Sequence, residues 1–364
     1  MSMDFDIIVI GAGIAGASVA ARLSATHRTA ILEMEERPGH HSTGRSLATF
    51  EPNYGPAPIR ALTRASRREF DDLKLLTPRE SMFLVPEGQE HEFAALKAAQ
   101  KGMREISLAE AKTRFPLLND GYCKNIMLDP ATADIDVDLL LQNFLRQFKA
   151  HGGALLCGHA VQSLQHESGQ WTVMAGGKSF RARIIVNAAG AWGDLVAGLA
   201  GAKPSGLQPK RRSIAVVPAP DGHDVTNWPW IGDPGETWYC KPQSGKLLVS
   251  RAEATHVDPH DAYADDMALA EGIDRFQQAT GIEVGRVEHT WAGLRSFAPD
   301  GNLVVGYDSR LDGFFWLIGQ GGYGIQTSPA LSRLAACLIR HEAMPQDIAA
   351  EGLVLKDIDP ARFA

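Results

Sequence analysis

The sequence predicts an α/β fold, in which a doubly wound parallel sheet is interleaved with a part built on a large antiparallel sheet. Residues 5–33 read as strand, glycine-rich turn, helix and strand. Residues 313–340 repeat the order strand, glycine loop and helix near the end of the chain. Residues 206–295 are richer in Trp, Pro and alternating apolar positions. The first two patterns are typical of βαβ units and the third of antiparallel strands.

Length and composition bound the class of protein. The 364 residues are 45% apolar and 22% charged, enough to bury a full core. The formal charge of −7, from 36 basic and 43 acidic residues, argues against a protein that neutralises nucleic-acid phosphates. No stretch approaches the roughly 18 apolar residues of a membrane span, and the first apolar run lacks the basic flank of a signal peptide. We therefore expect a cytoplasmic protein without an integral membrane segment or a nucleic-acid partner.

Three further helices are expected. Residues 58–76 carry apolar side chains at roughly helical spacing in a highly charged setting, which indicates an exposed amphipathic helix. Residues 133–152 place theirs at alternating steps of three and one, which indicates a helix face against a core. The closing helix is expected from about residue 328 to residue 340.

The remaining strands follow from shorter patterns. A strand pair is expected around 161 and 171–174, and the run at 183–190 is apolar on both faces, as in a buried parallel strand. Residues 237–241 and 246–250 alternate as antiparallel strands do. We predict one discontinuous domain from 1–50, 131–205 and 296–364, and a second, substrate-binding domain from 51–130 and 206–295.

The first glycine-rich turn has the context of a dinucleotide site. Gly11, Gly13 and Gly16 directly follow a strand and open a helix, and Glu33 ends the next strand. Such glycines let a pyrophosphate sit on the helix N-terminus, and the acid accepts hydrogen bonds from ribose hydroxyls. An acid at this position disfavours a 2′-phosphate, so FAD or NAD fits better than NADP.

The second glycine loop, residues 319–324, also precedes a helix, but no strand with a terminal acid follows it. It offers bare N–H groups and the positive end of a helix dipole, which would stabilise negative charge on a reduced flavin ring. A turn needed only for packing stays an alternative.

Residues 40–46 form a polar loop soon after Glu33, and its hydroxyls, glycine and arginine suit phosphate or ring polar atoms. His40 and His41 are adjacent, but no carboxylate or cysteine stands at metal-ligand spacing, so we expect a cofactor loop and no metal. The four cysteines, 123, 157, 240 and 337, contain no CxxC pair, which favours reduced thiols. Arg295 and the cluster 210–212 are candidates to hold a substrate carboxylate.

A set of blocks spread over nearly the whole chain now carries a specific resemblance. The chain resembles the FAD-dependent D-amino-acid dehydrogenases, closest to those acting on D-arginine, within the D-amino-acid oxidase and sarcosine oxidase superfamily. The blocks are residues 10–18 with Glu33, 41–46, 129–136, 186–192, 208–213, 289–297 and 320–327.

The resemblance implies a Rossmann-type FAD domain, a substrate domain with a large antiparallel sheet, and oxidative deamination. In that reaction a hydride leaves the substrate Cα for flavin N5, and the imino acid hydrolyses outside the enzyme. Arg212 and Arg295 would hold the carboxylate, assisted by the hydroxyls of Tyr54 and Tyr239. The implied residues at the substrate and flavin edge are Gly322 and Gln326. The implied cofactor-binding residues are Gly11, Gly13, Ile14, Ala15, Gly16, Glu33, Ser42, Thr43, Gly44, Arg45, Ser46, Val161, Ala189, Gly190, Trp192, Gly321, Gly322, Tyr323, Gly324, Ile325, Gln326 and Thr327.

Departures from the pattern concern the substrate. Where the D-arginine enzymes place a glutamate for the guanidinium, the alignable residue is Ser81, with Glu80 adjacent. In the loop 47–54 the family's histidine and threonine positions are Thr49 and Glu51, and Glu51 faces either a polar substrate side chain or solvent. Pro52 should stiffen that loop, and Trp230 and Leu47 should reshape the pocket.

Two further departures concern the cofactor. Gly293 stands near the position of the flavin-linked cysteine of sarcosine oxidases, so FAD should bind non-covalently. Alternation puts Lys246 and Leu247 on opposite faces of a strand, so one of the two is expected to face the flavin, and the sequence does not say which.

Three rivals share these motifs. The first oxidises N-substituted glycines, cyclic imino acids or opines; the second is a non-catalytic FAD-binding subunit; the third, an NAD-dependent dehydrogenase, is disfavoured by the second glycine loop and residues 41–46. A quinone, another acceptor or oxygen could reoxidise the flavin, and the sequence leaves that choice, the exact substrate and the oligomeric state open.

Overall fold

The structure is a computed structural model that describes residues 3–99 and 102–363. The predicted domain ranges also contain residues 1–2, 100–101 and 364, which lie outside this part of the chain. No helix among the described residues is long and apolar enough to cross a bilayer.

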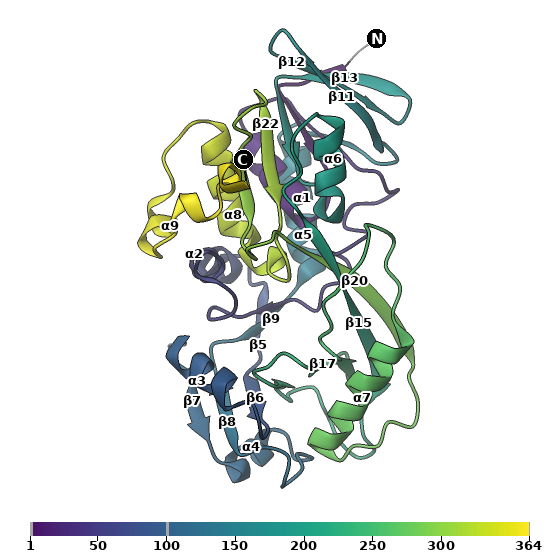
Figure 1. Ribbon diagram of the computed structural model, residues 1–364, viewed down its shortest axis with the longest axis vertical. Helices are drawn as coiled ribbons and strands as arrows, with labels where there is room; N and C mark the ends of the chain where they lie inside the picture. The colour runs from purple at the N-terminus through teal and green to yellow at the C-terminus, as the bar shows by residue number, and fades with distance from the viewer. Residues whose placement is uncertain (1–2, 100–101, 364) are drawn as a thin grey trace.

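A largely parallel sheet forms the centre of the upper half in Figure 1 and runs in the order β10-β3-β2-β14-β22-β21. Of the described strands in this sheet, only β21 is antiparallel to its neighbour. Every residue of β2, β3 and β22 is buried, as expected where both faces of a parallel sheet are covered. The strands are β2 (Ile7–Ile10), β3 (Thr29–Leu32), β10 (Ala154–Leu156), β14 (Ile184–Asn187), β21 (Val304–Tyr307) and β22 (Phe314–Ile318).

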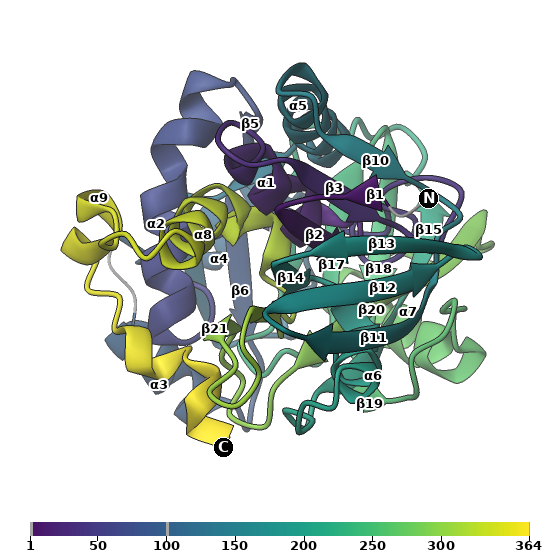
Figure 2. The same ribbon diagram turned by 90° about the horizontal axis from the view of Figure 1, so that it is seen from above.

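Alternate residues of this sheet enter two different cores. Ile7 and Val9 pack with the helix layer, whereas Ile8 and Ile10 pack with an antiparallel sheet and α6 on the opposite face (Figure 2). The helix layer contains α1 (Ile14–Leu23), α2 (Ala57–Asp72), α5 (Val137–Ala150) and α8 (Gly324–Ile339). The other face carries β1 (Met3–Asp4), β11 (Val161–Glu167), β12 (Gln170–Ala175), β13 (Lys178–Ala182) and α6 (Gly193–Leu199).

The lower half is built on a large, mostly antiparallel sheet in the order β19-β15-β18-β17-β16-β6-β8-β7, with β20 also paired to β15. Phe115, Trp238 and Phe276 are fully buried in the core beneath it. The strands are β6 (Ser81–Val85), β7 (Arg104–Ile106), β8 (Asn125–Asp129), β15 (Gln208–Pro218), β16 (Trp230–Gly232), β17 (Tyr239–Gln243), β18 (Lys246–Ser250), β19 (Thr255–His256) and β20 (His289–Phe297). The helices are α3 (Glu90–Ala99), α4 (Leu108–Arg114) and α7 (Asp266–Thr280).

Two connections join the halves. β15 and β20 run from the upper half into the lower one (Figure 1). A small sheet of β4 (Thr49–Phe50), β9 (Ala133–Ile135) and β5 (Leu76–Pro78) lies near the middle. The predicted parallel strand 183–190 and the predicted antiparallel strands 237–241 and 246–250 are thereby confirmed as β14, β17 and β18.

The closing helix begins earlier than predicted, at Gly324 instead of about residue 328. Pro329 has no N–H, so the carbonyl of Ile325 loses its helical partner, and the Ser328 hydroxyl donates to that carbonyl at 2.9 Å instead. Ser66 of α2 accepts the Ala330 N–H at 3.0 Å. The helix therefore continues through its proline.

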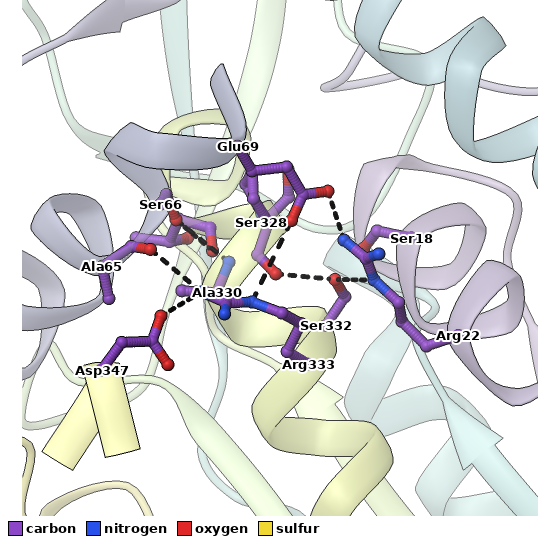
Figure 3. A network of polar contacts seen from close by, with 12 residues as sticks. Ser18, Arg22, Ala65, Ser66, Glu69, Ser328, Ala330, Ser332, Arg333 and Asp347 are labelled. Carbon is purple, nitrogen blue, oxygen red and sulfur yellow. Dashed lines mark hydrogen bonds and ion pairs between the residues drawn. The ribbon is translucent and has the colours of Figure 1, made fainter. Parts of the chain in front are cut away.

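A polar network surrounds this part of α8 (Figure 3). Glu69 of α2 pairs with Arg22 of α1, whose Nε lies 3.4 Å from the Ser332 hydroxyl of α8. Arg333 pairs with Asp347 of α9 (Gln346–Ala350) at 2.7 Å. These contacts fix α8, and therefore the loop that precedes it, against α1 and α2.

Candidate functional site

A cavity of about 990 Å³ opens at the carboxyl ends of β2, β3 and β14 and extends to β15, β17 and β20. Ligands of open parallel sheets bind at this edge. Most of the predicted cofactor-binding residues line it: Gly11, Gly13, Ile14, Ala15, Glu33, Ser42, Thr43, Arg45, Ser46, Val161, Ala189, Gly190, Trp192, Gly321, Gly322, Gly324, Ile325 and Gln326. Gly16, Gly44, Tyr323 and Thr327 do not line it. Tyr54, Arg212, Tyr239 and Arg295 do.

The first glycine turn forms a cradle that only glycines permit. Gly11 has φ +102°, and a Cβ there would lie 2.6 Å from the carbonyl oxygen of Ala188. A Cβ on Gly16 would lie 1.9 Å from the carbonyl oxygen of Gly11, which explains why Gly16 supports the turn from behind instead of lining the cavity. The Thr43 hydroxyl accepts the Ile14 N–H at 3.0 Å and closes the cradle.

Glu33 is buried beside this cradle. Its Oε2 accepts the Ala12 N–H at 2.6 Å, and its Oε1 accepts the Glu35 N–H at 3.0 Å. Each carboxylate oxygen retains a further lone pair for a ligand hydroxyl. The bare turn, the helix N-terminus of α1 and this acid together fit the pyrophosphate and ribose of a dinucleotide.

The polar loop 40–46 is tied to β20. The Ser42 hydroxyl donates to the Leu294 carbonyl at 2.6 Å, and Arg45 Nη1 donates to the Ala262 carbonyl at 2.9 Å while Nη2 pairs with Asp261. The Arg45 guanidinium is therefore already engaged with protein acceptors. Gly44 turns the loop behind the cavity wall, with its N–H 2.8 Å from the Gly39 carbonyl.

The expectation that no carboxylate accompanies the two histidines is wrong. The turn after β3 brings Glu35 to His41, with Oε1 2.8 Å from Nε2. One ligand atom from each of Glu35, His40 and His41 lies within 4.8 Å of the others. Sequence spacing missed this because the chain reverses between residues 35 and 41.

Arg295, on β20, lies at the end of the cavity opposite the glycine cradle. Its Nη2 donates to the Tyr54 hydroxyl at 3.2 Å, and that hydroxyl donates to Glu236 at 3.1 Å. Burial raises the pKa of Tyr54 above its ordinary value, so the phenol stays neutral. Burial opposes the charge of Arg295, but Tyr54, Tyr323 and Glu236 outweigh it and raise its pKa, so the guanidinium stays charged.

Arg212, on the neighbouring β15, lines the same end. Its Nε donates to the Glu253 carbonyl at 2.8 Å, and its guanidinium carbon lies 5.8 Å from the centre of the Tyr239 ring. Among the described residues no protein acceptor binds the Nη atoms of Arg212, unlike those of Arg45. The Trp230 ring stacks on the Tyr239 ring, with 5.8 Å between the two ring centres.

Gln326, in the first turn of α8, lies between the two ends. Its Oε1 accepts the Glu51 N–H at 2.8 Å. Its Nε2 is buried and has no hydrogen-bond partner among the described residues. A buried donor without an acceptor is costly, so the cavity fits a ligand that presents an acceptor here, as a flavin ring does.

The cavity wall also carries charged residues that no sequence pattern indicated, among them Glu236 and Lys241. Glu236 stands on the turn between β16 and β17 in a left-handed conformation with φ +51°. Lys241 of β17 is buried, and its Nζ lies 2.7 Å from the Leu47 carbonyl and 2.8 Å from Asp134. Only the pairing of distant strands brings them here, and no local pattern carries that information.

The expectation that Lys246 or Leu247 faces the flavin is wrong. Neither Lys246 nor Leu247 lines the cavity, because Lys246 pairs with Glu288 at 2.8 Å and Leu247 enters the lower core. Ser81 is buried outside the cavity, and Glu80 pairs with Arg114 at 2.8 Å. Neither Ser81 nor Glu80 is therefore part of the cavity wall.

Comparisons with known proteins agree with this geometry. Residues 6–338 match the family model described as FAD dependent oxidoreductase (DAO). The chain is 26% identical over 217 residues to an L-2-hydroxyglutarate dehydrogenase of Indibacter alkaliphilus, covering 54% of this chain and 52% of that protein. It is 27% identical over 245 residues to the uncharacterized oxidoreductase YurR of Bacillus subtilis, covering 64% and 62%. The matched region thus spans only about half to three fifths of these two relatives.

Solved structures give the same fold. An L-proline dehydrogenase from P. horikoshii superposes with a TM-score of 0.84 at 20% identity, covering 100% of this chain and 98% of that chain. A glycine oxidase from Geobacillus kaustophilus superposes with a TM-score of 0.83 at 20% identity, covering 97% and 99%. With its cradle, its cavity and a family match over most of its length, the chain belongs to the DAO family of FAD-dependent oxidoreductases.

Proposed function

We propose that this chain oxidatively deaminates amino acids, D-amino acids foremost. The substrate Cα loses a hydride, and the resulting imino acid hydrolyses to a 2-oxo acid and ammonia. The observation that carries the proposal is the charged, half-buried Arg295 at one end of a cavity whose other end is the dinucleotide cradle. Such a cation selects a substrate with a carboxylate.

The chain's own residues position the substrate. Arg295 and Arg212 hold the carboxylate, and the Tyr54 and Tyr239 hydroxyls add hydrogen bonds. Gly322 gives Arg295 the space it occupies, and Gln326 presents Nε2 to the cofactor ring. FAD, when bound, accepts the hydride. The rate enhancement comes from placement, so no nucleophile or catalytic triad is needed.

FAD binds non-covalently in this proposal. No cysteine is among the described residues that line the cavity, and Gly293 offers no reactive atom there. A quinone, another acceptor or oxygen reoxidises the reduced flavin.

The test is anaerobic mixing of the FAD-loaded protein with D- and L-amino acids, sarcosine, proline and 2-hydroxy acids, followed by visible absorbance. Bleaching by D-amino acids supports the proposal. Bleaching only by L-amino acids or 2-hydroxy acids overturns it. FAD binding without bleaching by any compound assigns the chain the role of a non-catalytic FAD-binding subunit.

Oxidation of N-substituted glycines or cyclic imino acids is a second candidate. The stacked rings of Trp230 and Tyr239 give the cavity a flat aromatic wall, against which a small or cyclic amine can pack. Two similar solved structures are named as a glycine oxidase and an L-proline dehydrogenase. Bleaching by sarcosine or proline alone favours this candidate.

A further inference from the structure

Glu51 is an acid inside the cavity at a fixed position. Its backbone N–H is bound to Gln326, and two further contacts hold its segment. Lys241 donates to the Leu47 carbonyl at 2.7 Å, and Asn53 Nδ2 donates to Asp129 at 3.3 Å. The segment is therefore anchored before, at and after Glu51, and the residue lines the cavity.

The carboxyl group of Glu51 interacts electrostatically with four charged residues on different elements. Asp129 approaches from β8, Glu236 from the turn before β17, Lys241 from β17 and Arg295 from β20. Burial, followed by repulsion from Asp129 and Glu236, raises the pKa of Glu51 to about 8, while Lys241 and Arg295 act in the opposite direction. An acid that titrates near neutral pH can both accept and hold a proton under working conditions.

The proposed reaction requires such a group. An amino acid enters as an ammonium, whose nitrogen has no lone pair to form the C=N bond. In the proposed binding mode the substrate carboxylate lies on Arg295, so the ammonium, one carbon away from it, lies in the cavity that Glu51 and Arg295 both line.

We propose that Glu51 accepts the proton that the substrate ammonium loses before its Cα is oxidised. The step converts –NH3+ and –COO− into –NH2 and –COOH. The Cα–H bond then breaks, its electron pair leaves as hydride to FAD, and the nitrogen lone pair forms the C=N bond. This inference rests on the proposed function.

The first test counts protons without turnover. Isothermal titration calorimetry with 2-aminoisobutyrate, which has no Cα hydrogen, is run on the FAD-loaded protein in buffers of different ionisation enthalpy. The wild type should release about one proton near pH 7, because protonated Glu51 and the ammonium come to share one proton, and almost none at pH well above 8. Glu51→Gln should release almost none at either pH. Equal release by both proteins overturns the proposal.

The second test follows the pH dependence of anaerobic flavin bleaching by D-alanine. The wild-type rate should rise through an ionisation near pH 8, and Glu51→Gln should rise only at the higher pH where the free amine ionises. In Glu236→Gln the rate should rise at a lower pH than in the wild type, because the substitution removes a negative charge that raises the pKa of Glu51. Glu87→Gln, a substitution of an exposed residue outside the cavity, is the control and should match the wild type.

The outcomes separate this inference from the function on which it rests. If no amino acid bleaches the wild type, the proposed function fails. If D-alanine bleaches it and Glu51→Gln keeps the same profile, only the role of Glu51 fails. A loss confined to substrates with cationic side chains makes Glu51 a specificity residue and also overturns the proposal.

Discussion

Gly322 faces the guanidinium of Arg295 so closely that a Cβ at Gly322 would lie 1.9 Å from Nη2. The loop before α8 therefore fixes the position of the cation that we assign to the substrate carboxylate. An alanine here must displace that guanidinium.

Gly322→Ala should retain FAD and lower kcat/KM about 100-fold, since a displacement of this size costs that much in a positioned site. Steady-state kinetics and flavin absorbance measure the two properties. Gly198→Ala, in α6 with nothing within 4 Å of the added carbon, is the matched control and should behave as the wild type. Unchanged kinetics in Gly322→Ala would contradict the contact.

Arg295→Met should lower kcat/KM by roughly 100-fold or more, because the carboxylate loses a charge-assisted hydrogen bond and the Tyr54 hydroxyl loses a donor. Arg295→Lys keeps the charge and should recover part of the loss. Both variants should bind FAD as the wild type does, as judged by the absorbance of the purified protein. Equal activity of all three proteins would remove Arg295 from the site.

Glu33→Ala should weaken FAD binding roughly 10–100-fold, because the Ala12 and Glu35 N–H groups lose their acceptor and the ribose loses its partner. Titration of the apoprotein with FAD, followed by flavin fluorescence, gives the affinity. Glu33→Gln retains one oxygen acceptor, so its affinity for FAD should lie between those of the wild type and Glu33→Ala. An affinity unaffected by Glu33→Ala would exclude this acid from the cofactor site.

Ser66→Ala should lower the free energy of unfolding by about 1 kcal/mol, since the Ala330 N–H beside Pro329 loses the hydroxyl that accepts its hydrogen bond. Urea unfolding measures the difference. If the network in Figure 3 fixes the loop before α8, the variant should also bind FAD more weakly. Wild-type stability would show that water replaces the serine.

The stability of the apoprotein should depend on pH through Glu51. Its pKa is about 8 in the folded protein against an ordinary value of 4.5, so the folded state binds this proton more tightly than the unfolded chain does. The stabilisation is complete below the ordinary value and is lost as the pH rises toward 8. Glu51→Gln does not titrate, so its advantage in unfolding free energy over the wild type should grow between about pH 5 and about pH 8. Parallel urea curves at each pH measure this, and a constant difference would place Glu51 in water.

The sequence predicted the features that depend on short-range geometry. Gly11, Gly13 and Glu33 could be interpreted from spacing because a strand, a turn and a helix bring them together locally. The start of α8 was placed too late, because proline is favoured in the first turn of a helix, whereas Pro329 lies in the second turn, where the hydroxyls of Ser328 and Ser66 compensate for it.

The charged wall of the cavity could not be predicted in the same way. Lys241 and Asp134 are separated by more than a hundred positions, and only the packing of β17 beside β9 makes them an ion pair. The burial that raises the pKa of Glu51 is likewise a property of the assembled fold. Arg295 was one of several arginine candidates by residue type, and only the pattern shared with a family set it apart, since an arginine in a strand carries no local sign that it lines a cavity.

One strand, β20, carries Gly293 beside the polar cofactor loop, Arg295 at the substrate end and Ser296, which bridges to Gly321 before α8. Trp230, Glu236 and Lys241, by contrast, stand on separate elements of the lower half. Substrate preference can therefore diverge, in evolution or by directed mutagenesis, through changes in that wall while the spacing between cofactor and carboxylate is preserved. A library restricted to Leu47, Thr49 and Trp230, which line the cavity and hold neither carboxylate nor proton in our proposals, would exploit this separation.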